Sequence, residues 1–306
     1  MRAVVVSQWG GPEVLTETEI DRPEPGLGEI LVRVHAAGVN PVDWKTRATG
    51  ALVSWDRIPV VGWDVSGTVE AVGPGVTLYR PGDEVYGMPR FPRQAGGYAE
   101  YVTAPARHFA RKPASLDHVQ AAALPLAALT AWQALVDTAG VTAGQRVLVH
   151  AAAGGVGHLA VQIAKARGAY VIGTASAAKH GVLRGLGADE LVDYRTEDFA
   201  EAVSDVDVVL DALGGEVAER SLRVLKPGGH LVTLPGPDVP AGAGGVRASF
   251  VVVEPDLRGL EEITALVEQG LLKPLVETVL PLEQAAKAHE IGEQGRTTGK
   301  IVLTVA

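Results

Sequence analysis

Residues 147–169 read VLVHAAAGGVGHLAVQIAKARGA, and this stretch decides the fold. An apolar strand runs into a turn of small residues, and the turn opens a helix in which apolar residues recur at helical spacing. Lys165 and Arg167 complement the negative end of that helix, and Gly168 can adopt the left-handed conformation that ends it. The pattern predicts a strand, turn and helix of the kind that begins a doubly wound α/β domain.

The turn between this strand and helix is predicted to bind a pyrophosphate, because free backbone N–H groups and the helix dipole favour an anion there. Against the pattern G-x-G-x-x-G, Ala152 replaces the first glycine. Gly154 lets the phosphate approach, and Gly157 lets the helix pack on the strand. An ordinary turn rich in Ala and Gly is the alternative, against which the later αβ units argue. We predict dinucleotide contacts from Ala153, Gly154, Gly155, Val156 and Gly157.

The end of the next strand, GTASAAKHG (173–181), indicates which dinucleotide binds. NAD enzymes present an acidic residue to the adenosine ribose here, but no Asp or Glu occurs between His158 and Ala188. Ser176 and Lys179 instead offer a hydroxyl and a cation to a 2′-phosphate, which an acid would repel. NADPH is therefore the expected cofactor. A solvated lysine in the first turn of a helix is the alternative for Lys179.

The pattern of predicted secondary structure changes near residue 125. Before it, short β segments such as 3–6 and 30–34 alternate with Gly- and Pro-rich turns. After it, a helix ending at Gly140 leads into alternating strands and helices, which predicts a parallel sheet. The further elements are YVIGTA, a Ser176-capped helix to about residue 186, ELVDY, VDVVLDAL, a helix through SLRVL, HLVTLP and a last strand in SFVVVE.

The final elements, LVETVLP, LEQAAKAHEIG and KIVLTV, are too few for a domain and are expected to return to the first one. Residues 235–245 are predicted to form a mobile loop.

The composition limits the possible functions. The length of 306 residues, 47% of them hydrophobic, suggests about two domains, and the net charge of -9 argues against a nucleic-acid partner. No cysteine is present, which excludes disulfides, thiolate catalysis and cysteine-ligated zinc. The eight histidines show no close metal-binding spacing. We find no secretory signal and no long apolar run, so we expect a cytoplasmic protein with no membrane partner.

The whole chain resembles the zinc-independent quinone oxidoreductases of the medium-chain dehydrogenase/reductase superfamily. The motifs occur in that family's order: AAGVNPVDWKTR, GWDVSGTVEAVGPGV, GDEVYG, GGYAEYV, ALTAW, AAAGGVG, KPGGHLVTLPG and GKIVLTV. The resemblance implies an α/β fold with a GroES-like β-rich catalytic domain, 1–124 with 270–306. A Rossmann domain with a doubly wound six-stranded parallel sheet would occupy 125–269, and the active site would lie in the cleft between the two domains.

The resemblance also implies a reductase without a metal. Zinc-dependent alcohol dehydrogenases of the superfamily carry a cysteine-rich lobe where this chain has only MPRFPRQA, residues 88–95. Asn40 follows the strand where those enzymes have a cysteine, and Asp64 in GWD is close to where they read Gly-His-Glu.

Individual roles follow from the same resemblance. Asn40 is expected near the nicotinamide and the substrate, although it could simply be a turn residue before Pro41. Lys45 takes the place of tyrosine in the pattern Asn-x-x-Asp-x-Tyr, as in the branch that reduces α,β-unsaturated carbonyls, and would polarise a carbonyl or relay a proton. The alternative for Lys45 is a contact with phosphate or solvent.

Further cofactor contacts are expected in the later motifs. Thr130 and Tyr194 have plainer alternatives, a helix-interior hydroxyl and a packing aromatic. The expected contacts are Thr130, Thr174, Ala175, Tyr194, Leu213, Pro235, Gly236, Phe250, Val251 and Val252.

The expected reaction is the transfer of a hydride from NADPH to a small-molecule quinone or enone. An enoyl-thioester reductase is an alternative, and so is a non-catalytic NADPH-binding structural or sensor protein, since a fold does not fix a function. Exposed edge strands would suit a homodimer.

Overall fold

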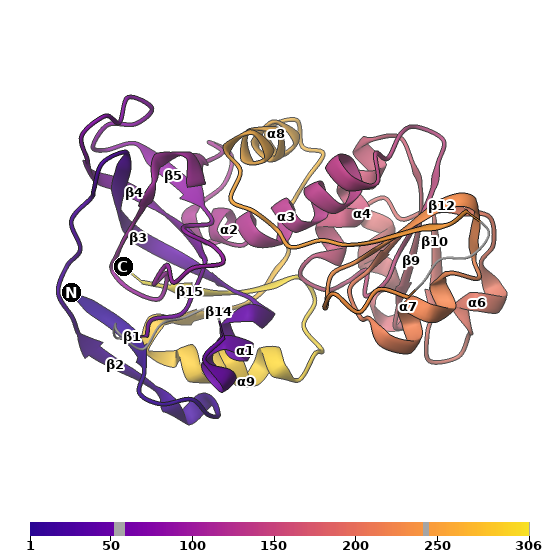
Figure 1. The fold of residues 1–306 in the computed structure, drawn as a ribbon, viewed down its shortest axis with the longest axis horizontal. Helices are drawn as coiled ribbons and strands as arrows, with labels where there is room; N and C mark the ends of the chain where they lie inside the picture. The colour runs from indigo at the N-terminus through magenta and orange to yellow at the C-terminus, as the bar shows by residue number, and fades with distance from the viewer. Residues whose placement is uncertain (52–58, 241–244, 306) are drawn as a thin grey trace. The chain divides into compact units, whose positions relative to one another are not determined.

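The computed structural model describes residues 1–51, 59–240 and 245–305, and the chain folds into two compact units (Figure 1). Unit 1 comprises Met1–Leu129, Glu254–Gln269 and Pro274–Ala306, and unit 2 comprises Thr130–Val253 with Gly270–Lys273. The chain passes from unit 1 to unit 2 within helix α3 (Pro125–Trp132), between Leu129 and Thr130. It continues as a π-helix over Gln133–Thr138, and Gly140 follows with a φ of 67°, which agrees with the predicted helix end.

Unit 2 is built on a parallel sheet, and in the part of the chain that the structure describes its strand order is β10-β9-β8-β11-β12-β13. Each neighbouring pair is parallel. Runs such as VDVVLD are largely apolar and β-branched, as strands covered on both faces require. The strands are β8 (Arg146–Val149), β9 (Tyr170–Ala175), β10 (Glu190–Asp193), β11 (Val206–Asp211), β12 (Leu225–Thr233) and β13 (Arg247–Phe250). The predicted doubly wound, six-stranded sheet is confirmed.

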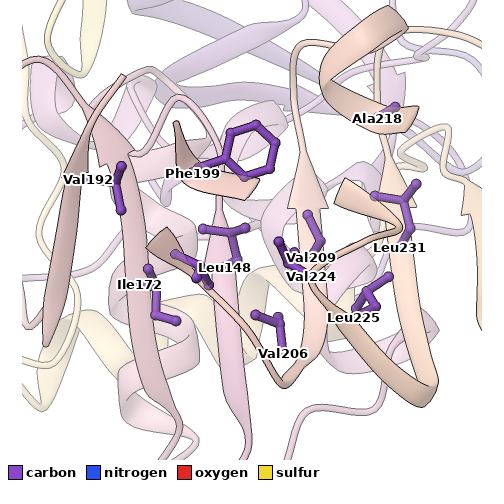
Figure 2. Close-up of a cluster of buried hydrophobic side chains, with 11 residues drawn as sticks. Leu148, Ile172, Val192, Phe199, Val206, Val209, Ala218, Val224, Leu225 and Leu231 are labelled. Carbon is purple, nitrogen blue, oxygen red and sulfur yellow. The ribbon is translucent and has the colours of Figure 1, made fainter. Parts of the chain in front are cut away.

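The helices of unit 2 connect these strands: α4 (Gly157–Ala166), α5 (His180–Gly185), α6 (Phe199–Ala202) and α7 (Gly215–Ser221). In α4 every residue from Gly157 to Ala164 is buried, and Gly168 follows the helix with a φ of 79°. Figure 2 shows the core on one face of the sheet, where Phe199 of α6 and Ala218 of α7 pack against aliphatic side chains of the strands. Each such aliphatic side chain contributes about 1.5–3 kcal/mol when fully buried.

Three predicted elements differ from the structure. The helix expected through SLRVL ends at Ser221, because Leu225 already pairs with Val206 at the start of β12. The last strand is Arg247–Phe250 rather than SFVVVE, because its partner β12 ends at Thr233 opposite Phe250. The helix expected to be capped by Ser176 begins as a 3₁₀ turn over Ala177–Lys179, without a side-chain cap.

The described residues of unit 1 form two sheets. Strands β1 (Arg2–Val6) and β2 (Leu15–Glu19) pair antiparallel, and a second sheet has the order β14-β15-β3-β4-β5-β7 with β6 beside β3. The strands of the second sheet are β3 (Glu29–Val39), β4 (Asp64–Val72), β5 (Glu84–Gly87), β6 (Tyr101–Pro105), β7 (Phe109–Arg111), β14 (Val276–Pro281) and β15 (Lys300–Thr304). The early strands predicted at 3–6 and 30–34 are confirmed.

The helices of unit 1 are α1 (Pro41–Thr49), α2 (His118–Ala122), α8 (Leu257–Glu268) and α9 (Ala285–Glu293). Further 3₁₀ turns cover Pro12–Val14, Ala106–His108 and Leu282–Gln284.

The final strands return to unit 1 as predicted, since β15 pairs antiparallel with β3 and parallel with β14. Helix α8 also packs in unit 1, where Tyr86 Oη donates a hydrogen bond to the Leu260 carbonyl at 2.7 Å. The predicted domain boundaries, 1–124 with 270–306 and 125–269, differ from the packing units at residues 125–129, at 254–269, which include α8, and at 270–273, and they stay a prediction. The predicted loop at 235–245 includes residues 241–244, which lie outside the described residues.

Candidate functional site

Apart from Thr130, the predicted cofactor contacts of unit 2 lie at one edge of its sheet. Because the strands are parallel and in register, their carboxyl ends share an edge, which is where doubly wound folds bind ligands. The contacts follow the strands: Ala153–Gly157 after β8, Thr174 to Ser176 and Lys179 at β9, Tyr194 after β10, Leu213 after β11, Pro235 and Gly236 after β12, and Phe250 to Val252 at β13. Six separate loops thus contribute to this edge.

The turn after β8 has the geometry of an anion site. A Cβ at Gly157 would lie 2.2 Å from the Ala151 carbonyl oxygen, so only glycine lets α4 start this close to the turn. Ala151 itself has a φ of 49°, an uncommon conformation for a residue with a side chain. Within the described residues, the N–H groups of Gly155, Val156 and Gly157 donate no hydrogen bond. Such consecutive amides at the start of a helix suit a pyrophosphate.

The end of β9 is buried and carries no acid. Thr174, Ala175 and Ser176 are all less than a tenth exposed, and Lys179 is half-buried in the turn that follows. The Thr174 hydroxyl, predicted as a cofactor contact, lies 3.1 Å from His150 Nδ1 and so has a partner inside the protein.

His150 belongs to the site region but was not singled out in the sequence. Ser221 Oγ donates its one proton to the Val217 carbonyl, so it accepts a hydrogen bond from His150 Nε2 at 2.9 Å. His150 Nδ1 is then the acceptor for the Thr174 hydroxyl. Burial lowers the pKa of His150 to about 4, so the imidazole is neutral at pH 7 and ties β8 to β9 and α7.

Asp211, at the end of β11, shapes the next loop and was also missed. It is fully buried, and its carboxylate accepts hydrogen bonds from the N–H groups of Leu213 and Gly214 at 2.9–3.0 Å. It also accepts one from the Thr233 hydroxyl of β12 at 2.9 Å. Three donors therefore hold the loop after β11 against the end of β12.

Three large apolar side chains at this edge are exposed: Tyr194 at 59%, Leu213 at 54% and Val252 at 52%. They follow three different strands, β10, β11 and β13, and so are spread along this edge of the sheet. Thr130, by contrast, is buried on α3.

In unit 1, the predicted residue Asn40 is buried at the start of α1 and has charged partners. Its Nδ2 donates a hydrogen bond to Asp64 Oδ2 at 2.8 Å, and its Oδ1 accepts one from Lys300 Nζ. Lys300 Nζ lies 3.2 Å from Asp64 Oδ2, and Asp64 Oδ1 accepts a hydrogen bond from Leu126 N at 2.6 Å. All three side chains are at most 3% exposed.

A second buried group adjoins Asn40. Asp43 Oδ2 accepts hydrogen bonds from the Asn40 N–H at 2.7 Å and from Tyr98 Oη at 2.9 Å. Burial raises the pKa of Asp43 to about 7, against the lowering effect of these two hydrogen bonds. Tyr98 Oη also lies 3.2 Å from His289 Nε2, and burial followed by the charge of Arg47 lowers the pKa of His289 to about 3.

Lys45 lies elsewhere on α1. It is exposed, whereas Asn40 is buried. Asn40 is the extended N-cap residue before α1, whereas Lys45 lies within the helix. The structure does not bring these two predicted catalytic residues into contact.

Two families of known domains match the chain. A profile described as "Alcohol dehydrogenase GroES-like domain" matches residues 26–114, and one described as "Zinc-binding dehydrogenase" matches residues 186–303. The "NADPH-dependent alkenal/one oxidoreductase, chloroplastic" of Arabidopsis thaliana is 38% identical over 99% of this chain and 79% of its own length. The quinone oxidoreductase structure from Coxiella burnetii superposes with a TM-score of 0.92 at 36% identity, covering 100% of this chain and 99% of that one.

The chain belongs to the quinone oxidoreductase family of the medium-chain dehydrogenase/reductase superfamily. This oxidoreductase also resembles the Escherichia coli quinone oxidoreductase complexed with NADPH, with a TM-score of 0.88, 30% identity and complete coverage of both chains. It resembles the CurK enoyl reductase, with a TM-score of 0.89, 31% identity and coverage of 100% and 99%.

A further match is to a much longer protein. The polyketide synthase GfsB of Streptomyces halstedii is 43% identical over 91% of this chain, but the chain spans only 5% of that protein's length. In the described part of this oxidoreductase, no helix combines the length and apolar character needed to cross a bilayer.

The residues of this oxidoreductase do not fit the zinc ion that one family description mentions. Asp64, close to the Gly-His-Glu position of the zinc enzymes, is paired with Lys300, and its neighbour Trp63 donates its indole N–H to the Arg93 carbonyl at 2.7 Å. Among the described residues no three His, Cys, Asp or Glu side chains cluster as metal ligands would.

Proposed function

We propose that this protein is a metal-free reductase that transfers a hydride from NADPH to a quinone or an α,β-unsaturated carbonyl. One observation carries the proposal: the predicted dinucleotide contacts lie at the carboxyl edge of one parallel sheet, beside a turn in which, within the described residues, the amides of Gly155, Val156 and Gly157 donate no hydrogen bond. The NADPH in the Escherichia coli complex and the NADPH named for the Arabidopsis relative support the choice of cofactor. The predicted homodimer and cytoplasmic location stay predictions.

The proposed cofactor site uses three kinds of group. The amides of Gly155, Val156 and Gly157 bind the pyrophosphate. Lys179 and Ser176 bind the 2′-phosphate and Tyr194 helps to enclose it, while the exposed Leu213 and Val252 cover the apolar faces of the rings. When bound, NADPH supplies the hydride.

The proposed roles of unit 1 concern the substrate oxygen. The Asn40 amide donates a hydrogen bond to the oxygen on which negative charge develops, and the exposed Lys45 ammonium is the proposed source of the proton. The Asp64 carboxylate forms an ion pair with the Lys300 ammonium, so it is not available as a metal ligand in this arrangement.

Anaerobic mixing of the protein and NADPH with a panel of quinones and enones tests the proposal. We expect acceptor-dependent loss of NADPH absorbance, and a slower loss with NADH. Protein unfolded by heat is the control for uncatalysed reduction. Tight NADPH binding by calorimetry without turnover of any acceptor would refute the proposed reaction while leaving the cofactor site intact.

An enoyl-thioester reductase is the second candidate, favoured by the likeness to the CurK enoyl reductase and to part of a polyketide synthase. A matched pair of acceptors separates the two functions: a crotonyl thioester of N-acetylcysteamine and pent-3-en-2-one, which share the same reacting double bond. A kcat/KM about tenfold or more in favour of the thioester, equivalent to about 1.4 kcal/mol in transition-state binding, would select the enoyl reductase.

A further inference from the structure

The cluster of Asn40, Asp64 and Lys300 carries an inference about the proposed reaction. A lysine only 3% exposed is rare unless it is paired, and Lys300 Nζ has two partners in the cluster: the Asn40 Oδ1 and the Asp64 Oδ2 at 3.2 Å. Asp64 is in turn fixed by Leu126 N, which donates to its other carboxylate oxygen at 2.6 Å. The amide of Asn40 is therefore held by two groups of opposite charge.

The chemistry of these partners fixes the direction in which the amide points. An ammonium group can only donate hydrogen bonds, and an ionised carboxylate can only accept them. In the observed arrangement the amide oxygen faces Lys300 and the amide nitrogen faces Asp64. A flipped amide would place its NH₂ against the ammonium and its oxygen against the carboxylate, so both interactions would become repulsive.

One donor of the amide is left for a ligand. The Asn40 Nδ2 has two N–H groups, and one of them donates to Asp64 at 2.8 Å. Within residues 1–51, 59–240 and 245–305, this nitrogen donates no second hydrogen bond. We infer that Lys300 is a positioning residue: together with Asp64 it holds the Asn40 amide so that this second N–H, and not the carbonyl, is presented to the substrate oxygen. That the N–H contacts a substrate oxygen rests on the proposed function.

The ion pair costs desolvation energy, which a purely structural role would not require. Burying two charges has a large desolvation cost before their attraction is counted, and pairs of apolar side chains often serve stability as well or better. A fixed amide direction is what the charged pair offers and an apolar pair does not.

The sequence allows a direct observation of this amide. Asn40 is the only asparagine among the 306 residues, so protein labelled with ¹⁵N-asparagine gives one side-chain NH₂ signal pair without assignment work. In wild type without ligand, we expect two well-separated protons, the one donated to the Asp64 carboxylate lying further downfield. In Lys300→Met we expect the separation to shrink or the pair to broaden as the amide becomes free to turn.

Lys300→Met leaves Asp64 as a buried unpaired charge and can lose stability for that reason. The double variant Asp64→Leu with Lys300→Met removes both charges and keeps a single asparagine in the chain. We expect it to fold, to bind NADPH with a Kd within about twofold of wild type, and to lose kcat by roughly tenfold to hundredfold, the value of one hydrogen bond made to a charged group. Lys300→Arg keeps the positive charge, so its NH₂ separation and its kcat should both lie between those of Lys300→Met and those of the wild type.

Lys287→Met is the matched control, because Lys287 is exposed on α9. It should leave both the NH₂ signals and kcat unchanged. Wild-type kcat in the folded double variant, or wild-type NH₂ signals in Lys300→Met, would overturn the inference while the proposed function stands. Altered NH₂ signals in a protein that reduces no acceptor would instead support the positioning of Asn40 and refute the proposed function.

Discussion

Replacing Asp43 by asparagine should remove one part of the pH dependence of the free energy of unfolding. Asp43 is fully buried, and burial raises its pKa from 3.8 to about 7. The folded protein therefore binds a proton on Asp43 that the unfolded chain releases, so its stabilising contribution is complete below about pH 4 and is lost as the pH rises through 7. An asparagine at this position is neutral at every pH.

The geometry indicates that asparagine fits the site. Its carbonyl oxygen can accept the hydrogen bonds from Asn40 N–H and Tyr98 Oη that Asp43 Oδ2 now accepts. Its NH₂ then takes the place of Asp43 Oδ1, which has no hydrogen-bond partner among the described residues. Both existing hydrogen bonds survive, and only the charge is removed.

The magnitude follows from the size of the pKa change. At about 1.4 kcal/mol per pH unit, the free energy of unfolding of Asp43→Asn relative to wild type should rise by about 2–3 kcal/mol between about pH 5 and 8. Urea unfolding followed by tryptophan fluorescence measures this difference, because four of the five tryptophans lie in residues 1–129. The exposed Asp21→Asn is the control and should show no such trend. Parallel stability curves for Asp43→Asn and wild type would refute the reasoning.

The remaining predictions concern the cofactor site and the absence of a metal. Lys179→Ala should raise the KM for NADPH about tenfold, the value of about 1.4 kcal/mol, and leave that for NADH nearly unchanged; an equal effect on both would remove the 2′-phosphate assignment. Gly157→Ala should weaken NADPH binding in calorimetry at least about tenfold, because its Cβ would overlap the Ala151 carbonyl, whereas Gly181→Ala, with open space around it, should bind normally and gain up to about 1 kcal/mol in stability. Dialysis against a chelator should leave kcat unchanged, and a loss that zinc restores would contradict the proposed metal-free reaction.

The sequence was sufficient where the determining interactions are local. The strand, turn and helix around residues 147–169 were predictable because small residues, helical spacing and the stop at Gly168 all lie within one short segment. The end of the helix before β12 was not, because its position depends on the pairing of Leu225 with Val206 across the sheet. Propensity alone extends that helix through SLRVL, and tertiary pairing ends it at Ser221.

In the candidate site, too, the sequence identified the residues that belong to local motifs and missed those whose partners are distant in the chain. Asn40 was identified by its motif, but Lys300 lies 260 residues away in a strand that reads as apolar, and only the sheet brings the two together. His150 and Asp211 were missed for a related reason, since their partners Thr174, Ser221 and Thr233 come from other strands and helices. A lysine beside glycine at the start of a buried strand was the one local signal that could have drawn attention to Lys300.

The pairing of β15 with β3 also sets an order of events during synthesis. Every residue of unit 2 leaves the ribosome before Lys300 does, so the Rossmann sheet can form on the nascent chain while the sheet of unit 1 still lacks β15 between β3 and β14. Until that strand arrives, Asp64 is without its cation and Asn40 is free to turn. In a nascent chain of this protein, the parallel sheet of unit 2 can therefore be complete before Lys300 is present to fix the direction of the Asn40 amide.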